Sequence, residues 1–291
     1  MKKKNVFIGV AWPYVNGDIH IGHLAGYLLP ADIYARFNRF IGNEVLMVSG
    51  SDCFGTPITV EADERGVKPA EIVEKYHKKN KELFKFLKIG FDEFGIYTRT
   101  DTENHKRVVQ DFFVKLLEKG FIFKNTTKQY FSKVENRFLP DRYVEGECPR
   151  CGNKQARSDQ CDNCGELLNE SELLNPKSKL TGSAVMLRPS EHYFFDWPKL
   201  QPFLKDYIKK HSGWRGQIKE KILREYVFRE AEGWLGQGLK SRAITRDLEW
   251  GIEIPIDKIP ADKRIAGVEK KRIYVWFEAV IGYLSASMEW A

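Results

Sequence analysis

The sequence has few cysteines and no long apolar run, and each shortage excludes a class of protein. Five cysteines in 291 residues are too few for a disulfide-rich secreted scaffold. The longest apolar stretches, residues 6–11 and 45–48, are far shorter than the roughly 20 residues that a membrane-spanning helix needs. No internal repeat or low-complexity tract is present. What remains is a folded globular protein without a membrane span, and its hydrophobic content of 42% is ordinary for one.

Acidic residues are fewer than basic ones, 40 against 47, which gives a formal net charge of +7. This balance favours a polyanionic partner such as nucleic acid, although an ordinary excess of surface lysines explains it equally well. The N-terminal run Met1–Lys4 is basic, but a strand-sized apolar run follows it without a small-residue cleavage site. We therefore expect a cytoplasmic protein.

The first fifty residues predict a strand, a helix and a second strand. Residues 6–11 form a short apolar run, Asp18 is a candidate helix cap, and Gly42 follows the helical stretch. Residues 45–48 predict a second strand that ends at Asp52. The apolar positions at helical spacing predict one buried helix face. They are Leu24, Tyr27, Leu28, Ala31, Ile33, Tyr34 and Phe37.

A strand, a crossover helix and a second strand are the unit of a doubly wound α/β sheet. The sequence thus predicts a Rossmann-like fold with a parallel sheet. Ligands of such sheets bind at the carboxyl ends of the strands, and His20, His23 and Asp52 all fall at that edge.

The rest of the chain divides by composition into three regions. Residues 70–87 and 102–119 predict amphipathic helices, the second stopped by Gly120, and complete a first region, 1–120. Residues 121–234 contain all the paired cysteines in a β-rich, loop-rich pattern and predict an inserted module. In the last region, 235–291, residues 273–277 predict a buried strand and residues 278–290 a helix, and the chain is expected to return to the first sheet.

The segment 18–23 places two histidines where a strand passes into a helix. Backbone amides and the helix dipole favour an anion there, and imidazoles can donate hydrogen bonds to phosphate oxygens as charge develops on them. Gly22 leaves room for a flat adenine ring. A histidine pair alone is also compatible with a helix cap or surface feature, and less well with a metal site.

The surrounding residues carry a family resemblance. Residues 11–24 read AWPYVNGDIHIGHL, which resembles the HIGH-type signature of class I aminoacyl-tRNA synthetases in the form found in methionyl-tRNA synthetases. Residues 45–58, 239–252 and 274–285 follow in order and resemble three further blocks of that family. The four blocks span nearly the whole chain.

The resemblance implies an enzyme that activates L-methionine with ATP, brought in with Mg²⁺, and transfers it to tRNA(Met). It implies a catalytic set of His20, His23 and Arg246. It implies an ATP site made by Asn16, Gly17, His20, Gly22, His23 and Glu278. It implies a methionine pocket made by Ala11, Trp12, Tyr14, Asp52, Trp276, Val280 and Tyr283, with Asp52 on the ammonium group.

Three departures from the family pattern affect the expected pocket. Cys53 and Phe54 replace an acidic residue and a ring after Asp52, so a polar role at the second position is lost. Glu278 replaces aspartate but could still reach a ribose hydroxyl, and Val280 replaces proline and restores a backbone donor. Taken without the family, Trp276 and Tyr283 are better explained as core residues, and Asp52 is equally well explained as a turn or cap residue.

Four cysteines form two CxxC pairs, Cys148 with Cys151 and Cys161 with Cys164. Two such pairs suit a tetrahedral ion, and because all four ligands are thiolates, no position remains open for catalysis. We expect one structural Zn²⁺ in a knuckle at about residues 145–170. An iron site has the same spacing, and free thiols are the alternative to both. In the resembling family this knuckle helps to guide the acceptor end of tRNA.

Class I synthetases also carry a Lys-Met-Ser-Lys-Ser-type loop, and no match to it is found in these 291 residues. The sequence is therefore expected to be a catalytic fragment with impaired activity, ending before that loop and the anticodon-binding domain. Two other interpretations remain open. One is a class I synthetase for another apolar amino acid or a small nucleotidylyltransferase. The other is a non-catalytic RNA-binding zinc protein derived from a synthetase.

Overall fold

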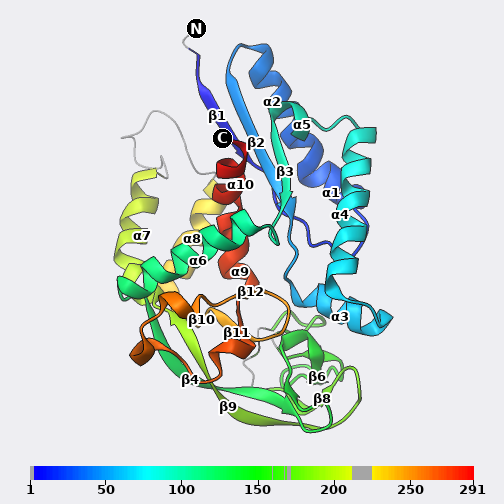
Figure 1. The fold of residues 1–291 in the computed structure, drawn as a ribbon, viewed down its shortest axis with the longest axis vertical. Coiled ribbons are helices and arrows are strands. Elements are labelled where there is room, and N and C mark those ends of the chain that lie inside the picture. Colours follow the sequence, from blue (N-terminus) through cyan, green and yellow to red (C-terminus); the bar gives the residue numbers. More distant parts are fainter. Residues whose placement is uncertain (1–2, 159, 167, 169–171, 212–224) are drawn as a thin grey trace.

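Three parallel strands form the sheet that organises the N-terminal region (Figure 1). The computed structural model describes residues 3–158, 160–166, 168, 172–211 and 225–291. In it β1 (Asn5–Gly9), β2 (Glu44–Ser51) and β3 (Gly95–Arg99) lie in the order β1-β2-β3. Ile8 pairs with Met47 and Met47 with Gly95, and both predicted strands are confirmed.

The crossover from β1 to β2 is helical but begins later than predicted. α1 (Ile21–His23) follows a cap at His20, and Asp18 instead pairs with Lys79 at 2.7 Å. The next turn, η1 (Leu24–Leu28), is a π-helix that runs directly into α2 (Leu29–Phe40). Pro30 has no N–H for the i−4 carbonyl and its ring would collide with that carbonyl, so a widened turn relieves the conflict.

The buried face predicted for this helix is wrong in its second half. Tyr34 and Phe37 are more than half exposed, as is Ile33, whereas Asp32 and Asn38 are buried. Asp32 accepts hydrogen bonds from the Gly90 amide and the Arg36 guanidinium, and Asn38 bonds the backbone of Tyr34 and the side chain of Asn43. Polar partners on neighbouring loops therefore turn the polar side of α2 inward.

Four more helices lead to and from β3. They are α3 (Thr56–Arg65), α4 (Pro69–Phe86), α5 (Phe91–Phe94) and α6 (Glu103–Glu118). The predicted helices 70–87 and 102–119 are confirmed to within a residue as α4 and α6. Thr102 caps α6 by accepting from the His105 amide, and Gly120 takes the left-handed φ of +69° at its end.

The middle of the chain is built on a long antiparallel ribbon. β4 (Ile122–Ser132) pairs with β9 (Val185–Phe195) over eleven positions, and β5 (Arg137–Phe138) and β10 (Arg242–Ala243) extend this sheet. A second sheet, at the lower right in Figure 1, consists of β6 (Val144–Glu147), β7 (Ala156–Arg157) and β8 (Leu174–Ser178). The short turn η2 (Asp141–Tyr143) leads into β6. The β-rich pattern predicted here is confirmed.

Two helices in this region were not predicted, α7 (Trp197–His211) and α8 (Glu225–Gln237). Residues 212–224 of the predicted insertion lie outside the described residues, as do 159, 167, 169 and 170 of the predicted knuckle. No helix in the described ranges combines the length and the apolar character that crossing a bilayer requires.

The last region forms a small antiparallel sheet and then a helical end. The sheet has the strand order β11-β13-β12 and consists of β11 (Thr245–Asp247), β12 (Ile252–Glu253) and β13 (Lys271–Ile273). Three short turns lie between β12 and β13, namely η3 (Ile256–Lys258), η4 (Ala261–Lys263) and η5 (Val268–Lys270). α9 (Val275–Glu278), η6 (Ala279–Ile281) and α10 (Gly282–Trp290) complete the chain.

The predicted strand 273–277 is thus wrong. The amides of Phe277 and Glu278 bond the Tyr274 carbonyl, and this turn starts a helix one residue after β13. The chain does return to the first sheet, but as helix α10, which packs on β2 and β3, and not as a strand. In Figure 1, α10 lies on one side of the sheet and α1, α2 and α4 lie on the other.

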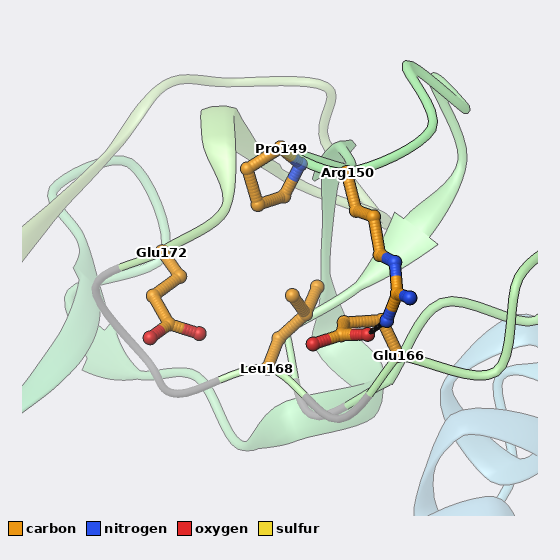
Figure 2. Close-up of a pocket in the computed structure, with 5 residues that line it drawn as sticks. All are labelled: Pro149, Arg150, Glu166, Leu168 and Glu172. Carbon is orange, nitrogen blue, oxygen red and sulfur yellow. Dashed lines mark hydrogen bonds and ion pairs between the residues drawn. The ribbon is translucent and has the colours of Figure 1, made fainter.

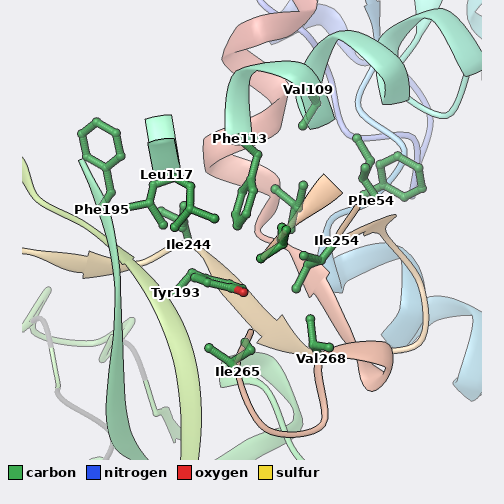
Figure 3. Close-up of a cluster of buried hydrophobic side chains, with 14 residues drawn as sticks. Phe54, Val109, Phe113, Leu117, Tyr193, Phe195, Ile244, Ile254, Ile265 and Val268 are labelled. Carbon is green, nitrogen blue, oxygen red and sulfur yellow. The ribbon is translucent and has the colours of Figure 1, made fainter. Parts of the chain in front are cut away.

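A large apolar core joins α6 to the central and C-terminal strands (Figure 3). Phe113 from α6 meets the Tyr193 ring of β9 edge-on at 5.2 Å, and Ile244 and Ile273 are among the fully covered neighbours. Because this core contains residues from before, within and after the 121–234 segment, it fixes that segment against the elements that precede and follow it.

Candidate functional site

An extended segment after β1 brings Tyr14 beside Asp52. The Asp52 amide donates to the Pro13 carbonyl at 2.9 Å, and the Val15 amide donates to the Asp52 carbonyl at 3.4 Å. These bonds continue the parallel pairing of β1 and β2 past the ends of the strands. The predicted carboxyl edge of the sheet therefore carries the aromatic residue and the carboxylate together.

The three rings predicted for the methionine pocket, those of Tyr14, Trp276 and Tyr283, lie at this edge together with the ring of Trp12, which was predicted there for its backbone. Trp12 meets Tyr283 edge-on at 6.2 Å, and Tyr14 meets Trp276 edge-on at 6.3 Å. The rings come from the strand-end segment and from α9–α10, so residues 262 and 271 positions apart form two ring pairs, which together are called the aromatic cluster. Trp276 is 62% exposed. Its indole is consequently at the surface of the cluster and not in the core.

Two glycines make room for the Trp12 ring. A Cβ on Gly50 of β2 would lie 2.3 Å from the ring, and one on Gly282 of α10 would lie 2.9 Å from it. Both distances are shorter than any carbon contact. The indole therefore fits between the sheet and α10 only because both positions lack a side chain.

Asp52 is a buried carboxyl with an unusual proton affinity. It is 5% exposed, and burial raises its pKa to about 7, against a smaller opposing effect of the Phe54 backbone amide. Its Oδ1 has no hydrogen-bond partner among the described residues. The charge also raises the pKa of the Tyr14 hydroxyl, after burial, which is the main cause. This oxygen is chemically suited to a cationic ligand.

Glu278 lies fully buried near Asp52 and is bound to His105. Its Oε2 is 2.8 Å from His105 Nε2, and its Oε1 has no hydrogen-bond partner within the described part of the chain. Burial, with the Asp52 charge as a second cause, raises the pKa of Glu278 well above its usual range. The ribose contact implied for Glu278 stays a prediction.

The two histidines of segment 18–23 cap the helix reciprocally. The Gly22 amide donates to His20 Nδ1 at 3.1 Å, and the His20 amide donates to His23 Nδ1 at 3.2 Å. Since both Nδ1 atoms accept, a neutral ring carries its proton on Nε2. Burial, with His20 as a second cause, lowers the pKa of His23 and favours this neutral form. Both Nε2–H groups are thus left as donors.

Gly22 has a second reason to be glycine. A Cβ there would lie 2.9 Å from the His20 ring, so the reciprocal cap itself excludes a side chain. The aromatic ring of Tyr27 meets His23 edge-on at 5.9 Å and stabilises its orientation. Asn16 and Gly17 are half-buried in the turn that precedes the cap.

The remaining predicted residues lie around this edge. Ala11 is exposed, and its carbonyl accepts from the Ser49 hydroxyl at 3.2 Å. Val280 is 60% exposed on η6. Arg246 donates to the carbonyls of its own strand region, at Ala243 and Thr245, and stacks over Tyr274 at 4.0 Å. Its guanidinium is thereby held against the residue that starts α9.

The four paired cysteines converge in the turns that follow β6 and β7. Their Sγ atoms all lie within 4.8 Å of one another, with Cys148 and Cys164 at 3.8 Å and Cys151 and Cys161 at 3.6 Å. An S₄ tetrahedron with metal–sulfur bonds of roughly 2.3 Å has edges of about 3.8 Å. The thiols therefore fit one tetrahedral ion.

The two CxxC pairs are held by matching backbone turns. The Gly152 amide donates to the Cys148 carbonyl at 3.0 Å, and the Gly165 amide repeats this contact on Cys161 at 2.8 Å, so the two turns have the same form. The backbone amide of Cys164 is the first cause that lowers the pKa of Cys161 to about 6, whereas burial is the first cause that raises the pKa of Cys164 to about 12. A thiolate is the form that binds a metal ion.

A hollow of about 460 Å³ lies beside the first pair (Figure 2). Arg150 and Glu166 form an ion pair in its wall. The lining residues are Pro149, Arg150, Glu166, Leu168 and Glu172. None of them was predicted to bind a ligand.

Sequence reasoning missed His105, Ser285 and Gly50. A single histidine in an amphipathic helix carries no local signal, and its partners Glu278 and Ser285 are 173 and 180 residues away. Gly50 stands within the second family block, but only its contact with Trp12 reveals its function.

The chain is similar to known proteins over almost its whole length. The family model described as tRNA synthetases class I (M) matches residues 6–291. The methionine–tRNA ligase of Roseiflexus sp. (strain RS-1) is 48% identical over 287 residues, covering 99% of this chain and 46% of the relative. That of Dehalococcoides mccartyi (strain CBDB1) is 49% identical over 288 residues, covering 99% and 48%. The chain thus spans about half the length of the curated relatives it matches.

Solved structures share the fold. The Mycobacterium tuberculosis methionyl-tRNA synthetase in complex with methionyl-adenylate superposes with a TM-score of 0.67 at 19% identity, covering 98% of this chain and 47% of that one. At this identity the likeness concerns the fold. The family match over residues 6–291, supported by relatives close to one-half identical, shows that the chain belongs to the class I tRNA synthetases of the methionine type.

Proposed function

We propose that this chain forms the amino-acid and ATP site of a methionine–tRNA ligase. The observation that carries the proposal is Asp52, a buried carboxyl beside the aromatic cluster, of which one oxygen has no hydrogen-bond partner in the part of the chain that the structure describes. A carboxylate in such a partly dry site binds an ammonium group strongly, and aromatic edges suit a polarizable thioether. The names of the relatives, methionine–tRNA ligases, agree with this chemistry.

In the amino-acid site, Asp52 pairs with the α-ammonium group of methionine. Tyr14, Trp276 and Tyr283 surround the side chain, and Ala11, Trp12 and Val280 line the same edge. Because Trp276 is 62% exposed, its ring is free to close over a ligand without disrupting the core.

In the ATP site, His20 and His23 donate their Nε2 protons to phosphate oxygens. The hydrogen bonds grow stronger as charge gathers on the phosphate in the transition state. Asn16, Gly17 and Gly22 border the nucleotide, Glu278 is proposed on the ribose side, and Arg246 assists near the adenylate. Mg²⁺ enters with ATP as part of the substrate.

The reaction then has two steps. A carboxylate oxygen of methionine attacks the α-phosphorus of ATP, and the bond to pyrophosphate breaks to give methionyl-adenylate. The terminal adenosine hydroxyl of tRNA(Met) next attacks the methionyl carbonyl, and AMP leaves. Positioning and charge stabilisation supply the acceleration, since no covalent intermediate with the protein is required.

The cysteine set is proposed to hold one structural Zn²⁺ through Cys148, Cys151, Cys161 and Cys164. The Sγ separations of 3.6 and 3.8 Å support a tetrahedral ion. With four thiolates bound, the ion stabilises the knuckle and takes no part in the reaction. We propose that this knuckle belongs to a connective insertion, residues 121–234, between two halves of the catalytic domain, 1–120 and 235–291.

The parallel sheet is proposed to belong to a doubly wound, Rossmann-like sheet. Helices on both of its faces support this, as does the exposed apolar surface of β1 and α2. Phe7 is 55% exposed and Phe40 is 88% exposed. The relatives are about twice as long as this chain, which allows further strands beside β1 in a full-length protein.

The test is ATP–pyrophosphate exchange with each apolar amino acid, measured on this chain and on the full-length protein. We expect exchange that depends on methionine. Exchange with another amino acid alone would overturn the specificity. No exchange with any amino acid in the full-length protein, with RNA binding retained, would favour a binding protein derived from a synthetase.

A further inference from the structure

Three buried side chains form a hydrogen-bonded chain beside the proposed methionine pocket, and the reaction described above leaves two of them without a role. His105 Nδ1 lies 2.7 Å from Ser285 Oγ, and His105 Nε2 lies 2.8 Å from Glu278 Oε2. All three residues are at most 1% exposed. The His105 ring lies 6.4 Å from the Trp12 ring, so the chain adjoins the pocket directly.

Burial disfavours the charged form of both ionisable members of this chain. Burial lowers the pKa of His105 to about 4, although the Asp101 charge acts in the opposite direction. His105 also occupies the first turn of α6, where the helix dipole disfavours an imidazolium ion. Burial and the Asp52 charge raise the pKa of Glu278. Both shifts favour a neutral hydrogen bond between His105 and Glu278 over an ion pair.

The neutral state fixes the direction of every hydrogen bond. Glu278 Oε2–H donates to His105 Nε2, and His105 Nδ1–H donates to Ser285 Oγ. The Ser285 hydroxyl donates in turn to the Gly282 carbonyl at 3.2 Å. With the opposite tautomer, the single Ser285 proton would have to serve both His105 and Gly282, and Glu278 would carry a second buried charge near Asp52.

We propose that His105 is a positioning residue that, together with Ser285, holds Glu278 as an uncharged acid, so that the pocket offers one negative charge, on Asp52, to one ammonium group. The choice of an amino acid as ligand rests on the proposed function. This arrangement keeps the negative charge on Asp52. If both buried carboxyls could ionise, they would share a proton, and the negative charge available to the ammonium group would be smaller. Tyr14 is the other ionisable group close to both carboxyls.

The hydrogen placement can be tested without any ligand. In ¹⁵N-histidine-labelled protein, the His105→Phe variant assigns the His105 signals among the six histidines. We expect a neutral ring protonated on Nδ1 from pH 6 to pH 8. The infrared difference between the wild type and Glu278→Gln should contain the carbonyl stretch of a protonated carboxylic acid. An Nε2–H or cationic His105, or a difference spectrum without that band, would overturn the inference.

The function of the chain is tested by methionine titrations across pH in four proteins: wild type, H105F, E278Q and the double variant. Loss of His105 removes the acceptor that stabilises the neutral Glu278, so Glu278 ionises more easily and competes with Asp52 for one proton. We expect H105F to raise the Kd for methionine on the order of tenfold and to move the pH midpoint of binding upward. In the E278Q background, where residue 278 cannot ionise, the midpoint should not move.

An equal loss of affinity in both backgrounds, with no shift of the midpoint, would mean that His105 is only structural and would overturn the proposal. If H105F does not fold by circular dichroism, Ser285→Ala replaces it and should move the midpoint in the same direction to a smaller extent. Absence of methionine binding in the wild type would refute the proposed function instead, and the ¹⁵N measurement would still decide the state of His105.

Discussion

The charge on Asp52 should control methionine binding. Asp52→Asn keeps the size of the side chain but removes the negative charge from the pocket. Hydrogen bonds to charged groups contribute about 1.5 to 3 kcal/mol, which corresponds to a roughly 10- to 150-fold increase in the Kd for methionine. Because the carboxyl is 5% exposed, solvent does not screen the interaction substantially, and the upper part of that range is expected.

The same carboxyl predicts a pH dependence of known sign. Burial raises the pKa of Asp52 to about 7, so below that value the carboxyl is protonated and must lose a proton before it can pair with an ammonium group. Affinity is therefore present above pH 7 and lost as the pH falls. The wild type should bind methionine roughly tenfold more weakly at pH 6 than at pH 8.

Calorimetric titration of L-methionine into the wild type and D52N, from pH 6 to pH 8, measures both effects together. D52N should bind weakly at every pH and without the tenfold slope. Glu191→Gln, a carboxyl replacement on β9 whose contact is with the Ala266 amide, is the matched control and should keep the wild-type slope. Equal affinity in D52N and the wild type, or a wild-type affinity that does not change with pH, would refute the reasoning.

Three further predictions concern the histidine cap, the metal site and the packing of Trp12 against glycine. His23→Ala should lower the turnover of methionine-dependent pyrophosphate exchange about 10- to 100-fold and should change the Kd for methionine much less. Stopped-flow measurement of methionine binding separates the two effects. A larger effect on binding than on turnover would contradict the phosphate role. The purified protein should release one equivalent of zinc to a chelator, as measured by metal analysis, and its Tm should fall when the zinc is removed. The Cys161→Ser variant should contain no zinc. Iron in the purified protein, or no metal, would contradict the proposed zinc site. Gly50→Ala should lower the free energy of unfolding in urea by about 1 to 3 kcal/mol, since its Cβ would lie 2.3 Å from the Trp12 ring. Gly17→Ala is the control and should not lower it, because no atom lies within 4 Å of the Cβ position at Gly17.

Local signals predicted the parts of the fold that depend on local chemistry. Helices α4 and α6 were found to within a residue, because Thr102 caps the second and Gly120 ends it in a left-handed conformation. The two parallel strands followed from short apolar runs in the same way. Caps, stops and strand patterns act over a few residues, so a sequence exposes them directly.

The errors arose where distant partners decide the outcome. Asp32 is buried because the Gly90 amide, 58 residues later, hydrogen-bonds it, and the apolar side of α2 is left exposed. The predicted strand 273–277 became a helix start because β13 already finds its partners in β11 and β12. Periodicity measures which residues share a face but not which neighbour covers it.

The candidate site shows the same division. A helix start near His20 and His23 could be predicted, and the anion site there stays a prediction. The reciprocal cap that leaves both Nε2 atoms as donors could be found only in the structure. The Glu278 contact with His105 could not be predicted, because nothing near either residue indicates a partner 173 positions away.

Methionine-dependent ATP–pyrophosphate exchange tests the central claim most directly, with the full-length protein as the enzyme and D52N as its matched variant. We expect exchange with methionine in preference to leucine, isoleucine and valine, and a loss of that exchange in D52N. Exchange that is equal for another apolar amino acid, or that survives unchanged in D52N, would contradict it.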